Sequence, residues 1–141
     1  MSRILGIDFG EARIGLAISD ELGLLAQGLP TFQRNINGNL LSYLKEIIDK
    51  NEIGRIVIGF PKMMDGTLGE KAEQVKKFAN TLKENFKIPI DLWDERLSSI
   101  QSQRILREMG KKYTRDKGSV DRMSAVLILQ NYLDYRKNKN E

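Results

Sequence analysis

The sequence contains no cysteine and no histidine. Without cysteine the chain forms no disulfide and offers no thiolate to a metal ion, which permits a cytoplasmic protein. Without histidine, zinc sites and the Ser-His or Cys-His systems of nucleophilic catalysis are excluded. Any catalysis by this chain therefore rests on carboxylates, lysines, hydroxyl groups or a hard metal ion.

Long apolar runs are also missing. No segment approaches the roughly 20 apolar residues of a membrane-spanning helix, and the first residues lack the apolar centre of a signal peptide. The 141 residues suit one domain, 1–141, with a core of its own. We therefore expect a single cytoplasmic domain without a membrane partner. The net charge of +4 is modest, so it is informative only where the cations cluster.

Two β-type runs near the N-terminus are separated by a glycine-containing turn. Residues 4–7 are apolar and rich in β-branched side chains, and residues 13–19 form a second run of this kind. The pattern predicts a β-hairpin with residues 9–12 at or near its turn.

Asp8 is the anomaly of this hairpin. Side chains alternate along a strand, so Asp8 shares a face with Ile4 and Gly6, where an apolar residue is expected. A buried carboxylate costs several kcal/mol unless it is paired or binds a metal ion. Asp8 either bonds the amides of the turn or pairs with Arg13, or it forms the floor of a metal or phosphate site. In the second case Gly10 would let a ligand approach the backbone.

The remaining chain alternates between strand and helix patterns. Three strands with short connections favour an antiparallel meander, in which Pro30 marks an edge strand or its end. Later strands are reached through helices, and such crossovers return a strand parallel to the sheet. After the hairpin we expect strands at 24–32, 55–60 and 88–93, and helices at 40–48, 69–86, 100–109 and 120–133. Asn51 and Gly54 would close the helix at 40–48, Ser119 would cap the last helix, and 136–141 would be a frayed polar tail.

Two further acids occupy informative positions. Glu95 directly follows the predicted strand 88–93, and open α/β sheets bind ligands at the carboxyl ends of their strands. Helix capping explains Ser98 and Ser99 well but Glu95 poorly. Asp121 is expected in the first turn of the last helix, where the helix dipole alone favours an acid. Taken alone, Asp121 is best explained as a helix-terminal charge.

A basic segment lies between these acids. Residues 110–118 are bounded by glycines and show no periodicity, which predicts a mobile surface loop. These charges either form a solvated face or contact a phosphate backbone, and an acidic site nearby favours the second alternative. Tyr113 within the loop could stack on a base. The cations in and around it are Arg104, Arg107, Lys111, Lys112, Arg115, Lys117 and Arg122.

The order of elements resembles the ribonuclease H-like fold, an α/β fold with a mixed five-stranded sheet, three antiparallel strands followed by two parallel ones, flanked by helices. Beyond the fold, the chain resembles the YqgF or RuvX-like family, which is related to the RuvC Holliday-junction resolvases. The likeness spans nearly the whole chain. It is carried by Asp8-Phe9-Gly10 with Arg13-Ile14-Gly15, Ile58-Gly59-Phe60-Pro61 with Met64-Asp65-Gly66, Asp94-Glu95-Arg96-Leu97-Ser98, and the run from Asp121 to Leu129.

This resemblance implies a bacterial, cytoplasmic, metal-dependent nuclease. It implies that Asp8, Glu95 and Asp121 are the catalytic metal ligands, with Asp8 shared between two Mg²⁺ or Mn²⁺ ions. The phosphate backbone would be held by the cations Arg13, Arg96, Lys111, Lys112, Arg115 and Lys117.

Several functions remain open at this level. The role that the resemblance implies is processing of the 5′ end of pre-16S ribosomal RNA, by a monomer or a homodimer. Cleavage of branched DNA by a junction resolvase and a non-catalytic RNA- or ribosome-associated factor are the alternatives. An actin-like sugar kinase or ATPase shares the opening hairpin, but it needs two such domains, and 141 residues provide one.

Overall fold

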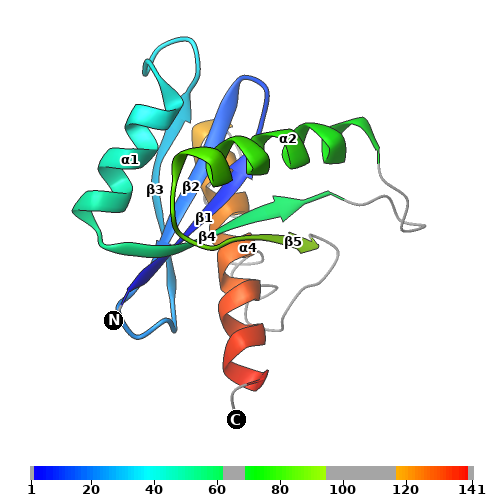
Figure 1. Cartoon of the computed structure of the whole chain (residues 1–141). Coiled ribbons are helices and arrows are strands. Elements are labelled where there is room, and N and C mark those ends of the chain that lie inside the picture. Colours follow the sequence, from blue (N-terminus) through cyan, green and yellow to red (C-terminus); the bar gives the residue numbers. More distant parts are fainter. Residues whose placement is uncertain (1, 62–68, 95–116, 140–141) are drawn as a thin grey trace.

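The computed structural model describes residues 2–61, 69–94 and 117–139, and its strands form one mixed sheet (Figure 1). The strand order is β3-β2-β1-β4-β5. The pairs β1–β2 and β2–β3 are antiparallel, whereas β1–β4 and β4–β5 are parallel. This confirms the predicted sheet, including the edge position of the strand that contains Pro30. The bounds are β1 Arg3–Phe9, β2 Arg13–Ser19, β3 Ala26–Gln33, β4 Ile53–Phe60 and β5 Ile90–Asp94.

Helices cover both faces of the sheet (Figure 1). The described helices are α1 Leu40–Lys50, α2 Glu70–Asn85 and α4 Lys117–Lys139. Helices α1 and α2 pack on one face, and α4 crosses the other face, where it contacts β1, β2, β3 and β4. No helix in the described ranges is both long enough and apolar enough to span a membrane.

The two-residue period of β1 divides the core into two clusters. Leu5, Ile7 and Phe9 belong to the cluster under α1 and α2, whereas Ile4 belongs to the cluster under α4. Gly6 lies on the α4 face as well, because a Cβ atom there would come within 2.8 Å of the Cβ of Leu129. The absence of a side chain at this position lets α4 lie close to the centre of the sheet.

The ends of several elements differ from the sequence prediction. Asn51 ends α1 as expected, but Gly54 lies inside β4 rather than between the two elements. Helix α4 starts at Lys117, so Ser119 is a helical residue and not its cap. Residues 136–139 continue α4, where the guanidinium of Arg136 lies 5.7 Å from the centre of the Tyr132 ring. The predicted helix 100–109 and loop residues 110–116 lie outside the described residues, and the single-domain boundary stays a prediction.

Candidate functional site

Asp8 lies at the carboxyl end of β1, on the face of the sheet that α4 covers. Its side chain is half-buried. Its partner on β2 is Gly15. On the other side, the β1–β4 register pairs Ile7 with Ile58, and its continuation by one residue brings Gly59 beside Asp8. Neither neighbour carries a side chain, and glycines within strands often mark the close approach of another group.

The start of α4 lies towards the end of β1 that carries Asp8. A Cβ on Gly6 would meet the Cβ of Leu129 and, at 3.4 Å, the carbonyl oxygen of Ala125, whereas Ile4 lines a hollow with Leu133. Moving along β1 from Ile4 to Gly6 therefore corresponds to moving back along α4. The backbone of residue 121, about one helical turn before Ala125, thus lies towards the Asp8 end of this face.

The helix-terminal explanation of Asp121 is wrong. Because α4 starts at Lys117, residue 121 lies beyond the first turn, which contains no acidic residue. The favourable field of a helix N-terminus falls off within that turn. The dipole therefore does not account for an acid at this position.

Arg122, the next residue, anchors the start of α4 to the sheet edge. Its Nε–H donates a hydrogen bond to the carbonyl oxygen of Leu29 on β3, at 3.0 Å. Its aliphatic stem lies over Gly28, where a Cβ atom would overlap both Cγ and Cδ of the arginine. The sequence prediction counted Arg122 only among the basic residues. A glycine inside a strand was the available signal, since it often marks the close approach of another group.

Arg13 shares the face of Asp8. Side chains alternate along β2, and Gly15 is paired with Asp8, so Arg13 projects to the same side of the sheet two residues nearer the turn. It is half-buried. Gly10 has a structural reason that needs no ligand, because a Cβ atom there would overlap the carbonyl oxygen of Arg13.

A polar network ties α4 to β5, at the edge of the sheet opposite β3. The carboxylate of Asp91 on β5 accepts hydrogen bonds from the hydroxyl of Tyr132, at 2.6 Å, and from Nη1 of Arg55, at 2.7 Å. Burial raises the pKa of Tyr132, and the hydrogen bond to Asp91 raises it further. The rings of Trp93 and Tyr132 meet edge to face, with centroids 5.6 Å apart. Helix α4 is therefore fixed both at β3 and at β5, and Asp8 lies on β1, the central strand of the sheet.

Most of the other predicted site residues lie outside the described part of the chain. Glu95 and Arg96 follow the last residue of β5, whose carboxyl end faces the same edge of the sheet as that of β1. Lys111, Lys112 and Arg115 are likewise not described, and the structure gives only the backbone of Lys117 and Asp121. Within the described residues no group of three acidic side chains could hold a metal ion. The three-acid site therefore stays a prediction, of which the structure describes one side chain, that of Asp8.

The comparison with protein families decides the lineage. A family model described as "RuvX: Holliday junction resolvase" matches residues 2–135. The chain belongs to the RuvX family. A relative from Thermoanaerobacter pseudethanolicus is 49% identical, over 97% of this chain and 99% of its own length. A relative from Desulfitobacterium hafniense (strain DSM 10664 / DCB-2) is 47% identical, over 98% of this chain and 96% of its own. Both carry the name "Putative pre-16S rRNA nuclease".

Solved structures establish the fold of this RuvX-family chain. T. thermophilus RuvC in complex with a Holliday junction substrate aligns with a TM-score of 0.60 and 13% identity, over 98% of this chain and 97% of that one. The yeast mitochondrial Holliday junction resolvase Ydc2 aligns with a TM-score of 0.58 and 11% identity, over 99% and 80%. The fold is therefore ribonuclease H-like, as the sequence predicted.

Proposed function

We propose that this RuvX-family protein is a cytoplasmic, divalent-metal-dependent nuclease that processes the 5′ end of pre-16S ribosomal RNA. The observation that carries the proposal is the direction of α4 on β1, which brings the start of the helix, with position 121, towards the end of β1 that carries Asp8. Family membership and the names of the curated relatives support the reaction and the substrate.

The proposed metal ligands are Asp8, Glu95 and Asp121, with Asp8 shared between two ions. Carboxylate oxygens are the ligands that Mg²⁺ and Mn²⁺ prefer. Asp8 is flanked on the two neighbouring strands by Gly15 and, one residue beyond the last β1–β4 pair, by Gly59, and glycine often stands where another group approaches a strand closely. Without a cation, carboxylates about 4 Å apart repel each other by a few kcal/mol at an effective dielectric constant near 20. When bound, two divalent ions supply an activated water and stabilise the leaving oxygen of a phosphodiester.

The protein's cations would hold and orient the substrate. Arg13 is suited to this because it lies on the face of Asp8 and nearer the edge of the sheet. Its guanidinium can bind a phosphate through two parallel hydrogen bonds. The remaining cations lie close in sequence to the other two proposed ligands. One directly follows Glu95, and the others precede Asp121. They are Arg96, Lys111, Lys112, Arg115 and Lys117.

A substrate comparison tests the proposal. The purified protein is incubated with Mg²⁺ or Mn²⁺ and a ribosomal RNA precursor, an unrelated single-stranded RNA or a four-way DNA junction. We expect metal-dependent cleavage at the 5′ end of the precursor. Selective cleavage of the junction would support the second candidate, a resolvase, which the family description favours. Tight binding of the precursor without cleavage under any of these conditions would indicate a non-catalytic ribosome-associated factor.

The metal site has a test of its own that does not depend on activity. A ligand that binds the folded state raises the melting temperature, so Mn²⁺ should stabilise the wild-type protein. Glu95→Gln and Asp121→Asn should each reduce this shift. If both variants respond to Mn²⁺ as the wild type does, the three-acid site is wrong.

A further inference from the structure

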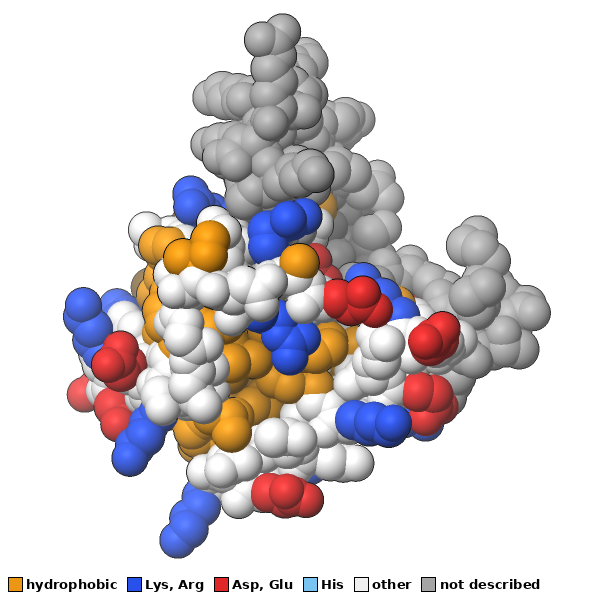
Figure 2. All heavy atoms as spheres, turned by 90° about the horizontal axis from the view of Figure 1, so that it is seen from above, with side chains coloured by type: hydrophobic (Ala, Val, Ile, Leu, Met, Phe, Trp, Pro, Cys, Tyr) orange, Lys and Arg blue, Asp and Glu red, His pale blue; other side chains and the backbone are white. Residues whose placement is uncertain are grey.

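The face of the sheet opposite Asp8 carries a hollow between α1 and α2, with a volume of about 500 Å³. We call it the α1–α2 hollow. Figure 2 shows apolar side chains exposed on this side of the molecule, with a basic side chain reaching over them. A volume of this size is typical of small-ligand sites. The lining residues that the argument uses are Phe9, Glu11, Arg34, Leu40, Leu41, Lys77 and Phe78.

A guanidinium forms one wall of the α1–α2 hollow. Arg34 places its guanidinium 5.2 Å from the centre of the Phe9 ring, and Phe9 in turn stacks on Phe78 with centroids 4.4 Å apart. Nη1 of Arg34 donates hydrogen bonds to the carbonyl oxygens of Gly10 and Glu11, each at 3.3 Å. The guanidinium is thus held in place by the Phe9 ring and by two backbone carbonyls.

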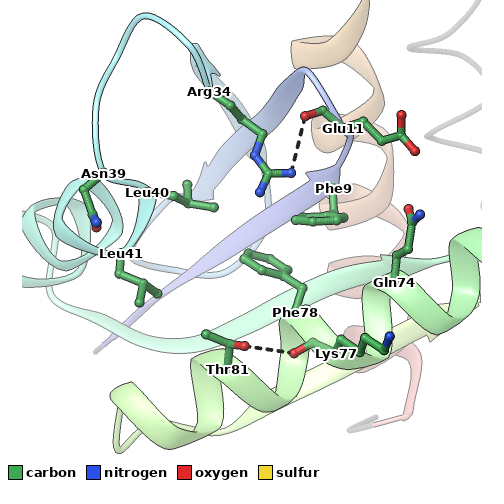
Figure 3. Close-up of a pocket in the computed structure, with 10 residues that line it drawn as sticks. All are labelled: Phe9, Glu11, Arg34, Asn39, Leu40, Leu41, Gln74, Lys77, Phe78 and Thr81. Carbon is green, nitrogen blue, oxygen red and sulfur yellow. Dashed lines mark hydrogen bonds between the residues drawn. The ribbon is translucent and has the colours of Figure 1, made fainter.

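The opposite wall is aliphatic. Figure 3 shows Leu40 and Leu41 across from the Arg34 guanidinium and the Phe78 ring. Phe9 and Phe78 are only 9% and 8% exposed, so a ligand would touch the outer plane of Arg34 and the leucines more than the two rings. A hollow lined by a guanidinium and by aliphatic side chains suits an aromatic heterocycle. Unpaired bases of nucleic acids stack on arginine planes in this way.

The hollow continues towards the catalytic edge. A second hollow of about 420 Å³ shares Phe9, Glu11 and Gln74 with the first and extends to Gly10 and to Lys71 at the start of α2. Gly10 comes two residues after Asp8, at the end of the sheet where the metal site is proposed. Lys71 and Lys77 on α2 supply positive charge for phosphates along this path. Glu11 and Glu70, which line the second hollow as well, repel phosphate, but a carboxylate accepts hydrogen bonds from the amino group of a base.

We propose that the α1–α2 hollow binds one unpaired base of the strand that crosses the catalytic edge, stacked between Arg34 and the leucines. This rests on the proposed nuclease function, because it assigns a substrate subsite. It adds that the substrate is single-stranded next to the cleaved bond. RNA and DNA share the base chemistry, so the test includes both.

The test uses labelled single strands that carry one abasic nucleotide, moved along the sequence, with EDTA present to prevent cleavage. Anisotropy should reveal one position at which loss of the base weakens binding roughly 5- to 100-fold. Arg34→Ala should remove this position dependence, and Arg34→Lys, which keeps the charge but not the plane, should remove it as well. Lys45→Ala, an exposed cation on α1 that does not line the hollow, is the matched control.

A filled hollow provides an independent variant. Thr81 lies on the exposed rim, and its hydroxyl bonds only the carbonyl of Lys77 in its own helix among the contacts described. Thr81→Trp should abolish the position dependence with Arg34 intact, and melting curves confirm that each variant is folded. RNA and DNA strands of the same sequence show which sugar the subsite accepts.

Two outcomes overturn the proposal. A wild-type protein for which every abasic position binds equally has no base subsite, and an Arg34→Lys variant that behaves like wild type shows a purely electrostatic role. Cleavage of the precursor in Mg²⁺ is measured in parallel. A cleaving enzyme with a flat abasic series retains the nuclease function and loses only the subsite. Position dependence without cleavage retains the subsite as a nucleic-acid contact and removes the nuclease function.

Discussion

The two faces of the sheet are built by different means. Under α1 and α2 the contacts are largely apolar, with Leu5, Leu44 and Leu82 fully buried. Under α4, polar contacts flank a smaller apolar cluster: Arg122 bonds β3 on one side, and Tyr132 bonds Asp91 of β5 on the other. Apolar contacts are non-directional, whereas hydrogen bonds depend on distance and angle. The face under α1 and α2 thus contributes mainly to stability, whereas the contacts of the other face fix the position of α4 on the sheet.

A face that fixes the position of a helix suits the proposed site, which needs β1 and α4 in a defined arrangement. Gln130 is fully buried in α4, where its side chain accepts a hydrogen bond from the amide of Ala26 and donates one to the carbonyl of Leu24, each at 3.0 Å. Buried polar groups without partners are costly, so sliding of α4 along the sheet would break several such bonds together. The position of α4 relative to β1 is therefore a defined one.

The largest effect on activity is expected at Asp8, on the face that α4 covers. Asp8→Asn should reduce cleavage about a thousand-fold or more, because a metal ion contributes several kcal/mol to stabilising the reaction. The metal-free melting temperature should stay the same or rise, since clustered negative charge is relieved. Cleavage assays and melts in EDTA check both. A variant that melts much lower would show that Asp8 is a structural acid.

The opposite face should show the reverse pattern. Leu82→Ala removes a fully buried side chain under α2 and should lower the free energy of unfolding by about 2–5 kcal/mol. Denaturant titration measures this loss. At a temperature where the variant is folded, its Mn²⁺ affinity should match that of the wild type. A weakened affinity would mean that the two faces are not independent.

Gly28→Ala tests the position of α4 directly. The added methyl group overlaps the stem of Arg122, and overpacking of this kind costs about 1–3 kcal/mol. The Mn²⁺-induced rise in melting temperature should shrink, because the start of α4 moves. In the double variant Gly28→Ala with Arg122→Ala the clash is absent, so the methyl should add little to the effect of Arg122→Ala alone. Additive losses would contradict this coupling.

The smallest effect concerns Tyr132. Tyr132→Phe removes the hydrogen bond to Asp91 and should cost about 1 kcal/mol near neutral pH. The pKa of Tyr132 is raised on folding, so its stabilisation is complete below the unfolded value of about 10. It is lost as pH rises through the folded pKa. Unfolding free energies of the two proteins, measured from pH 7 upwards, should therefore converge.

The sheet was predictable because its signals are local. Runs of β-branched residues indicated the strands. Asp8 was conspicuous because side chains alternate along a strand, which puts it on a face where an apolar residue is expected. The start of α4 was missed because Lys117 and Gly118 carry no apolar period. The role of Arg122 was hidden for another reason, since it bonds a carbonyl 93 residues away. The wall formed by Arg34, which directly follows β3, likewise depends on the ring of Phe9 on β1.

Separation along the chain has a consequence for biosynthesis. Arg122 bonds a carbonyl 93 residues earlier, and the amide of Ala26 bonds a side chain 104 residues later. The core under α1 and α2 uses residues 5–90 and can form while the chain is still being translated. The second layer requires α4, which leaves the ribosome after these residues. Asp8 is thus made early and residue 121 late, so synthesis of α4 is the step that would complete the proposed site.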